Sequence, residues 1–319
     1  MSELHQPLLD WYRSHRRDLP WRRLSDPYAT WVSEIMLQQT TVAAVVPYFQ
    51  RWIERFPTVE VLAAEDEADV MPYWAGLGYY SRARQLLKGA KSVAVSGMPK
   101  SVAGWLAVPG VGPYTAGAIA SIGQGIPAAL VDGNVERVFS RLTDFDKPKP
   151  KLTAAAWDWA TREVHQAAPS DWNQALMELG ATVCTSRDPK CELCPVSEFC
   201  LARKRGTERL RPVVLAKPEP IQVYHEISVF VCDGKVGLRK AGMGEWWKGL
   251  YVLPWKAVSE PVSGAPNLRF TVTKHRITGF VLFESVEQCD PSLEWFAIDE
   301  LASVALPSPH RKAIQIAIA

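Results

Sequence analysis

The sequence contains no uninterrupted apolar run approaching the ~18 residues that a membrane-spanning helix needs. It also has no internal repeat and no low-complexity tract, which excludes a repeat architecture and a compositionally disordered chain. Of the 319 residues, 47% are hydrophobic and 22% are charged. This composition is that of a globular protein with material for about two domains, and we expect it to be cytoplasmic, with no membrane contact.

Net charge is nearly absent as well. A formal charge of +2 is too small for a protein that is basic all over, so any surface for nucleic acid has to be local. One candidate segment holds Arg13, Arg16, Arg17, Arg22 and Arg23 against Asp18, and the other, residues 203–211, holds five cations against Glu208. Taken alone, each segment is more typical of a solvated face than of a binding site.

Cysteine is scarce, and four of the six cysteines fall within seventeen residues: Cys184, Cys191, Cys194 and Cys200. Gaps of six, two and five residues suit one tetrahedral centre, either an iron-sulfur cluster or zinc, and the spacing alone favours neither strongly. Two disulfides are the alternative, but they need an oxidising compartment, and residues 1–18 are charged and lack the apolar core of a signal peptide. We therefore expect a metal centre, followed by positive charge over 203–205 that faces nucleic acid.

The two remaining cysteines, Cys232 and Cys289, lie apart from this group. We expect both to be buried thiols in a reducing cytoplasm.

Hydrophobic periodicity divides the chain into three parts. From residue 4 to about 202, apolar side chains such as Val45, Phe49 and Ile53 recur at three- and four-residue steps, which predicts a mainly α domain over 1–202. Residues 203–220 are basic and interrupted by proline, and we interpret them as a linker. Residues 221–319 contain short segments rich in β-branched and aromatic residues, with a helix near the end, which predicts a smaller α+β domain.

Residues 101–121 place Pro109, Gly110, Val111, Gly112 and Pro113 between two short helical runs. The glycines permit a tight turn with positive φ, and the second proline suits the first turn of the next helix. Amide groups at such a helix start can hold a phosphate. The pattern therefore favours a DNA-binding hairpin, with the Gly-Val-Gly turn at the DNA, over a plain connection.

Several segments, taken in order along residues 8–202, resemble one family: WVSEIMLQQTTVAAVVPYF, GLGYYSRARQL, PGVGPYTAGAI, LVDGNVERV and NQALMELGATVC. With the hairpin and the cysteine spacing, they resemble the helix-hairpin-helix DNA glycosylases and, among these, the MutY adenine DNA glycosylases. The resemblance implies base excision repair by a monofunctional glycosylase. Such an enzyme acts as a monomer on double-stranded DNA and removes adenine mispaired with 8-oxoguanine or guanine. It also implies a [4Fe-4S] cluster on the four cysteines, rather than zinc.

Cleavage of an N-glycosidic bond needs a proton for the leaving base and tolerance of positive charge on the sugar, and two carboxylates can divide that work. Glu34 lies one helical turn from Trp31 and Gln38, so its carboxyl could be desolvated and keep a proton. Spacing alone favours a surface glutamate, whereas the resemblance implies the residue that protonates adenine. Asp132 stands at an expected helix start, where aspartate is a preferred N-cap. The resemblance implies that it stabilises the oxocarbenium-like sugar or adds to it, with Asn134 assisting.

Position 114 separates two related chemistries. Relatives that resemble endonuclease III carry a lysine there, which forms a Schiff base with the sugar and then cuts the strand. Tyr114 offers no amine, which predicts base removal without strand cleavage. The resemblance implies that its hydroxyl orients the groups around the sugar.

An adenine inside a duplex is reached by extruding its nucleotide, at a cost of roughly a few kcal/mol. The resemblance implies that Gln39 and Tyr79 wedge into the base stack and that Arg22 and Glu178 contact adenine. For Tyr79 and its neighbour Tyr80, packing in a helical core is an equally good explanation.

MutY proteins end in a domain that resembles the Nudix hydrolase fold and reads the 8-oxoguanine, and residues 235–255 resemble its early strands. The sequence has no acidic Nudix helix for a metal, so we expect recognition without hydrolysis. The family usually has Phe-Ser-His where this chain has Val272, Thr273 and Lys274, followed by His275. Thr273 keeps a hydroxyl, but the aromatic wedge is missing, and the imidazole is replaced by the Lys274 amine or displaced by one residue. Thr273 and Lys274 are equally well explained as exposed strand residues, and the preference for 8-oxoguanine over guanine is left open.

The sequence is also compatible with two other functions. One is an endonuclease III-like glycosylase and lyase on oxidised pyrimidines, against which the residue at position 114 argues. The other is a noncatalytic iron-sulfur DNA-binding module, which would not need both Glu34 and Asp132. For the repair enzyme we expect a location on the bacterial nucleoid.

Overall fold

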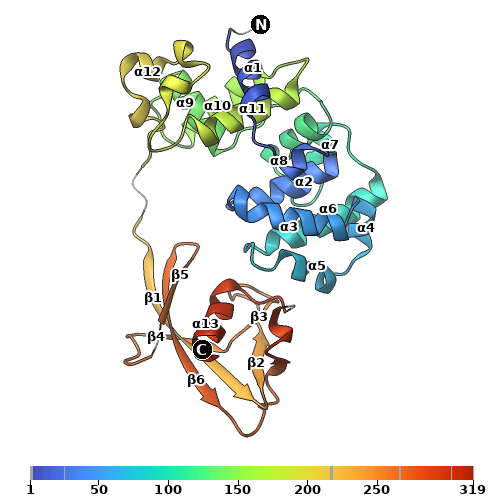
Figure 1. Ribbon diagram of the computed structural model, residues 1–319, viewed down its shortest axis with the longest axis vertical. Coiled ribbons are helices and arrows are strands. Elements are labelled where there is room, and N and C mark those ends of the chain that lie inside the picture. The colour runs from blue at the N-terminus through green and yellow to red at the C-terminus, as the bar shows by residue number, and fades with distance from the viewer. Residues whose placement is uncertain (1–2, 25, 216–217, 266, 303, 319) are drawn as a thin grey trace. The chain divides into compact units, whose positions relative to one another are not determined.

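The computed structural model describes residues 3–24, 26–215, 218–265, 267–302 and 304–318. Contacts divide the chain into two compact units, one formed by residues 1–65 and 84–216 and the other by residues 66–83 and 217–319. In its described part the first unit consists of helices and connections, whereas the second contains the sheet (Figure 1). Among the described residues, no helix has both the length and the apolar character needed to cross a lipid bilayer.

The longer helices of the first unit are α1 (His5–His15), α2 (Pro27–Leu37), α3 (Val42–Arg55), α4 (Val59–Ala64), α6 (Ser81–Ser96), α7 (Val102–Leu106), α8 (Pro113–Ala118), α9 (Gly133–Leu142), α10 (Lys151–Glu163), α11 (Pro169–Thr182) and α12 (Leu201–Arg205). Single turns connect them: η1 (Pro20–Arg22), the π-helical η2 (Ile119–Gly123), η3 (Cys191–Leu193), η4 (Ser197–Phe199) and η5 (Glu208–Leu210). The mainly α fold predicted for this part of the chain is confirmed.

Local sequence sets where the helices of the site begin. Asp26 accepts a hydrogen bond from the Ala29 N–H at 2.6 Å ahead of α2, and Asp132 accepts one from the Val135 N–H at 2.8 Å ahead of α9. Such N-caps satisfy amides that have no partner within the helix. The apolar faces of α1, α9, α10 and α11 then form one core, which holds the start of α9 in place.

The segment 203–220, expected as a linker, begins with ordered structure. Arg205 and Arg211 both pair with the carboxylate of Asp144, at 3.0 and 2.8 Å. These contacts attach α12 and η5 to the end of α9, so the helical unit extends past residue 202 and the boundary between the units falls after residue 216. Residues 66–83, which carry α5 (Glu67–Trp74), group with the second unit.

The strands of the second unit are β1 (Ile221–Cys232), β2 (Lys235–Lys240), β3 (Tyr251–Val252), β4 (Trp255–Val258), β5 (Asn267–Val272), β6 (His275–Ser285) and β7 (Glu294–Ala297). They form a sheet of order β3-β2-β1-β6-β5, in which β4 also pairs with β1 and β7 with β2. The long central pair β1 and β6 is parallel, and the other pairs are antiparallel. After η6 (Glu300–Ala302), α13 (Ser308–Ile318) packs on β1, β5 and β6, so the predicted α+β architecture is confirmed.

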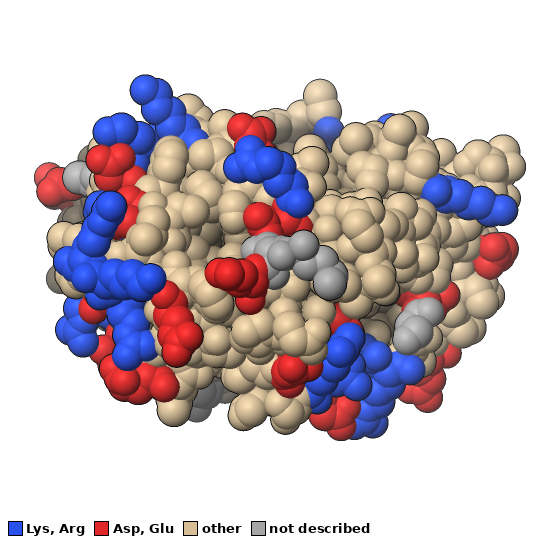
Figure 2. Space-filling model, turned by 90° about the horizontal axis from the view of Figure 1, so that it is seen from above, with Lys and Arg blue, Asp and Glu red and all other residues tan. Residues whose placement is uncertain are grey.

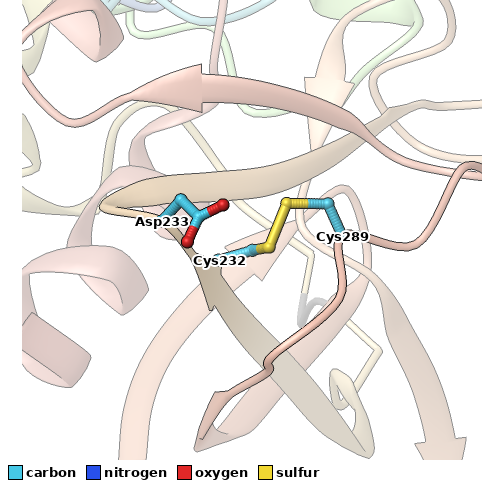
Figure 3. Close-up of side chains that lie close together, drawn as sticks. All are labelled: Cys232, Asp233 and Cys289. Atoms are coloured by element: carbon cyan, nitrogen blue, oxygen red, sulfur yellow. A yellow bond between two sulfur atoms is a disulfide. The ribbon is translucent and has the colours of Figure 1, made fainter.

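The expectation for the two isolated cysteines is wrong. Cys232 and Cys289 form a disulfide, with their Cα atoms 5.6 Å apart (Figure 3), and Cys289 lies on the surface. The pairing of β1 with β6 brings them together. Val231 lies opposite Ser285, and the Val286 N–H donates to the Val231 carbonyl at 2.9 Å, so the loop after β6 runs beside the end of β1.

Candidate active site and iron-sulfur centre

A cavity of about 630 Å³ opens in the first unit. Its lining includes all four predicted catalytic residues and three of the predicted DNA- or adenine-contacting residues: Glu34, Tyr114, Asp132 and Asn134, with Arg22, Gln39 and Glu178. These side chains come from η1, α2, α8, α9 and α11 and the turns beside them. Tertiary folding has therefore brought together residues up to about half the chain apart.

Glu34 sits in the last half of α2 and is only 6% exposed. The Tyr114 hydroxyl donates a hydrogen bond to its Oε2. Burial raises the pKa of the Glu34 carboxyl to about 7; the hydrogen bond from Tyr114 opposes this rise, and the charge of Asp132 adds to it. Glu34 is thus not the surface residue that spacing alone favoured, and near neutral pH much of it carries a proton.

Asp132 caps α9 and also lines the cavity, and its catalytic role stays a prediction. One carboxylate oxygen accepts from the Val135 N–H as the α9 N-cap, and the other accepts from the Asn134 side-chain amide at 2.7 Å. Burial raises the pKa of Asp132, while these two hydrogen bonds favour its charged form and oppose the rise. Glu34 and Asp132 are therefore two carboxyl groups of one cavity held in different environments.

Tyr114 lies in the first turn of α8, directly before the π-helical turn η2. Such π-helical turns often occur beside functional sites. Burial and the neighbouring carboxyl of Glu34 raise the pKa of the Tyr114 phenol well above its ordinary value. It therefore stays neutral and acts as a hydrogen-bond donor to Glu34.

Glu178 is held by two arginines, one of which was not singled out from the sequence. The Arg17 guanidinium donates to both carboxylate oxygens at 2.7 and 2.9 Å, and Arg22 donates at 2.8 Å. Burial alone would raise the pKa of Glu178, but the hydrogen bonds from both arginines outweigh it and bring the pKa to about 2. The basic run at residues 13–23 was the signal for Arg17, and its carboxylate partner lies about 160 residues away, beyond the reach of sequence patterns.

The predicted hairpin is present between α7 and α8. Gly110 has φ +80°, and a Cβ added there would come within 2.5 Å of the Gln85 Cβ, so glycine is required both by backbone conformation and by space. Gly112 is the residue before α8, and Val111 is buried. The turn geometry is as predicted, and contact of these residues with DNA stays a prediction.

The two predicted wedge residues share an unusual backbone conformation. Gln39 and Tyr79 have φ of +58° and +46°, a region that non-glycine residues rarely adopt. Gln39 lines the cavity, whereas Tyr79 is not among the lining residues and belongs to the segment 66–83. Tyr79 is 53% exposed and Tyr80 is buried, so core packing explains Tyr80 and not Tyr79.

The four clustered cysteines surround a small cavity of about 30 Å³. All four are free thiols, and burial together with neighbouring cysteines raises the pKa of Cys194 to about 12. Four thiolates in such a place need a compensating positive centre, and the thiol donor set fits an iron-sulfur cluster. Arg141, only 2% exposed, donates to the Cys184 Sγ at 3.2 Å and to the Thr185 carbonyl at 2.7 Å.

A second arginine of α9, not singled out from the sequence, connects this centre to the cavity. Arg137 donates to the Cys184 carbonyl at 2.8 Å and to the Asn134 side-chain oxygen at 2.8 Å. It also donates to the Gly180 carbonyl at 2.8 Å. It stands within the segment LVDGNVERV, but only the fold shows that its partners lie on three separate elements.

The basic segment 203–211 carries less free charge than its sequence suggests. Arg203 pairs with Glu192 at 3.0 Å, and Arg209 pairs with Asp188 at 2.7 Å. Figure 2 shows Lys and Arg in separate groups with Asp and Glu beside them, divided by wide areas that carry neither. This arrangement agrees with the small net charge and indicates local positive patches.

Thr273 and Lys274, the predicted lesion-recognition residues, form the turn between β5 and β6 in the second unit. Val272 pairs with His275 to close it, and both turn residues are exposed. Thr273 has φ +53°, which is strained for a β-branched side chain. They are therefore tip residues, outside the regular strands.

Comparison with known proteins identifies the family of this fold and of the cysteine segment. Residues 32–162 match the HhH-GPD superfamily base excision DNA repair protein, and residues 184–200 match the iron-sulfur binding domain of endonuclease III. Among solved structures, a thermostable thymine-DNA glycosylase is 28% identical, with a TM-score of 0.56 over 62% of this chain and 94% of that one. An endonuclease III–DNA complex, at 21% identity and a TM-score of 0.52 over 63% and 94%, shows the same fold.

Adenine DNA glycosylases are among the curated relatives of this chain. The adenine DNA glycosylase of Homo sapiens is 47% identical over 62% of this chain and 39% of its own length, and that of Arabidopsis thaliana is 44% identical over 63% and 37%. The adenine DNA glycosylase of Buchnera aphidicola subsp. Acyrthosiphon pisum is 33% identical over 78% of this chain and 73% of its own. The chain thus spans less than half the length of the human and plant relatives and most of the bacterial one. The cofactor expected over residues 184–200, a [4Fe-4S] cluster, is confirmed, and this chain belongs to the adenine DNA glycosylase family.

Proposed function

We propose that this protein is a monofunctional glycosylase that flips out and excises adenine mispaired with 8-oxoguanine or guanine in double-stranded DNA. The observation that carries the proposal is the shared cavity. It holds one carboxyl that retains a proton near neutral pH, Glu34, and one whose charged form is hydrogen-bonded, Asp132. An N-glycosidic bond breaks readily when a base is protonated as it leaves and a carboxylate faces the sugar.

The residues divide the reaction between them. Glu34 donates its proton to a ring nitrogen of adenine, so the base leaves uncharged with the electron pair of the broken C–N bond. Asp132, oriented by Asn134, stabilises the positive charge on the deoxyribose or adds to it, and water then bonds to the same carbon and gives up a proton. Tyr114 holds Glu34 in place and offers no amine for strand cleavage.

DNA recognition is assigned to the surroundings of the cavity. Amides of the Gly110–Gly112 turn contact a phosphate, Gln39 and Tyr79 fill the space left by the extruded nucleotide, and Arg22 with Glu178 forms the adenine end of the pocket. Cys184, Cys191, Cys194 and Cys200 would hold the [4Fe-4S] cluster, which would cross-link the loop that carries them. We propose that the protein acts as a monomer on the nucleoid.

The second unit is proposed to be Nudix-like and to read the base opposite adenine through Thr273 and Lys274. Its mixed sheet with a covering helix supports the assignment. We propose recognition without hydrolysis because the sequence has no acidic Nudix helix that would bind a metal.

Single-turnover base release from A:8-oxoguanine, A:G and A:T duplexes tests the proposal. Wild type is expected to release adenine from the A:8-oxoguanine and A:G duplexes. Glu34→Gln and Asp132→Asn are expected to release it far more slowly than wild type. Unchanged rates in both variants contradict the assigned roles. Borohydride trapping of a covalent DNA adduct would instead indicate lyase chemistry, and binding without release from any mispair would indicate a noncatalytic module.

A further inference from the structure

Beside the β5–β6 turn, the second unit carries a row of aromatic rings that leads away from His275. The ring of Trp246 lies 5.4 Å from that of His275 and 5.5 Å from that of His225, stacked on the latter at 28°. His225 in turn stacks on Trp255 at 4.4 Å and 17°. The row is therefore continuous from the tip of the hairpin into the sheet.

Trp246 reaches this place from a loop that is fixed at both ends. The loop joins β2 to β3, and the Glu245 carboxylate pairs with Arg239 at 2.6 Å and accepts from the Gly242 N–H at 2.5 Å. The next residue, Trp247, has φ +62° and packs inward, with its ring 5.0 Å from that of His310. Trp246 itself is half-buried, so it is held in position yet keeps part of its surface open.

Charge at this end of the sheet suits a polyanion. Lys274 and Arg276 are exposed at the hairpin tip. Acidic residues gather at the other end of β6 and beyond it: Glu284, Glu287, Asp290 and Glu294. Nine residue steps along β6 separate His275 from Glu284, about 30 Å at the usual rise, so this acidic group lies far from the hairpin tip. Glu219, before β1, and Glu260, after β4, stand at the same end as the tip, so the positive charge is confined to Lys274 and Arg276. Phosphates are attracted to these two side chains.

We infer that Trp246 is the aromatic residue that packs against the base opposite adenine, with His275 beside it. The inference rests on the proposed function, because it concerns the base that the second unit reads. An aromatic face held rigidly beside a basic turn is the arrangement on which nucleobases stack. The phenylalanine missing from the turn at position 272 is thus replaced from a different loop, and the imidazole is contributed by the residue after Lys274.

Equilibrium binding tests this separately from excision. Duplexes with 8-oxoguanine or guanine opposite cytosine contain no mispaired adenine, and duplexes with the same purines opposite adenine are the substrates. The variants are Trp246→Ala, Trp246→Phe and His275→Ala. The matched control is Trp295→Ala, a half-buried tryptophan of β7 at the acidic end, whose indole N–H donates to the Asp290 carbonyl at 2.9 Å. Thermal unfolding is measured for every variant.

Trp246→Ala is expected to weaken binding to 8-oxoguanine duplexes by about tenfold or more, the size of one lost stacking contact. Trp246→Phe should restore most of the affinity, and Trp295→Ala should leave it unchanged. The inference is overturned if Trp246→Ala and Trp295→Ala bind alike, or if phenylalanine restores the unfolding temperature without restoring affinity. If wild type excises no adenine but Trp246 still determines affinity, the proposed activity fails and the inference stands. If wild type excises adenine but Trp246→Ala binds as tightly as wild type, the inference is overturned and the proposed activity stands.

Discussion

Replacing Glu34 with glutamine tests the acid role that the cavity supports. A pKa of about 7, against an ordinary value of 4.5, corresponds to about 3 kcal/mol in favour of keeping the proton. At pH 7 about half of the molecules are then protonated at Glu34, compared with roughly one in 300 for an unshifted glutamate. Glutamine cannot transfer a proton to the leaving base, so we expect single-turnover adenine release to fall by about 100-fold or more.

The pH profile separates proton donation from mere loss of a contact. For wild type, the rate should be highest below the pKa of Glu34 and fall about tenfold per pH unit above about pH 7. In Tyr114→Phe the break should move to higher pH, because the phenol hydrogen bond favours the charged carboxylate. A wild-type rate that is constant between about pH 6 and 9, or a break that moves to lower pH in Tyr114→Phe, would refute the reasoning.

The same substitution has a signature in stability. The folded protein binds the Glu34 proton more tightly than the unfolded chain, so wild type loses stability as pH rises from 4.5 through about 7. Glutamine has no such loss. Glu34→Gln should therefore be stabilised relative to wild type by up to about 3 kcal/mol at about pH 8, and the difference should vanish near pH 4. Denaturant unfolding at the two pH values measures it, and a pH-independent difference would contradict the raised pKa.

Three further outcomes are expected. Asp132→Asn should abolish adenine release in the single-turnover assay without lowering the unfolding temperature, because asparagine also caps helices, whereas Asp132→Ala should additionally cost about 1 kcal/mol. Glu178→Gln should destabilise the first unit by about 3 kcal/mol in urea unfolding, because it leaves two arginines without their buried partner. That difference should shrink as pH falls from 4.5 towards 2, since the lowered pKa stabilises the fold only where Glu178 is charged. Changing both Cys232 and Cys289 to serine should lower the stability of the second unit by about 4 kcal/mol, because the bridge spans 57 residues, and a reductant should have the same effect on wild type in calorimetry.

Features that depend on near neighbours in the chain were predictable. The cap at Asp132, the turn at Gly110 and the spacing of the four cysteines each involve residues that meet within a few positions. The change from helical periodicity to short segments rich in β-branched and aromatic residues similarly separated the helical and sheet-containing parts. The predicted linker began too early because the partner of Arg205 and Arg211 is Asp144, which no local pattern connects to them.

The candidate site was only partly predictable. The residue types indicated a proton donor at Glu34, a hydrogen-bond donor at Tyr114 and a charged carboxylate at Asp132. Spacing could not tell whether the glutamate is buried or on the surface. The pairing of Arg17 with Glu178 and the bridge from Arg137 to the cysteine loop join distant elements, and both were missed. The disulfide was mispredicted for the same reason, because the register of two parallel strands decides which cysteines meet.

By itself, the sequence determined which functional groups are available: two carboxyls, a tyrosine in place of an amine, four thiols and a turn that requires glycine. Only the tertiary structure decided how acidic each carboxyl is, because a pKa depends on burial and on neighbours contributed by other helices. Asp132 and Glu34 differ little as amino acids. They differ in this protein because Asp132 caps a helix and accepts from the Asn134 amide, whereas Glu34 accepts a hydrogen bond from the Tyr114 phenol.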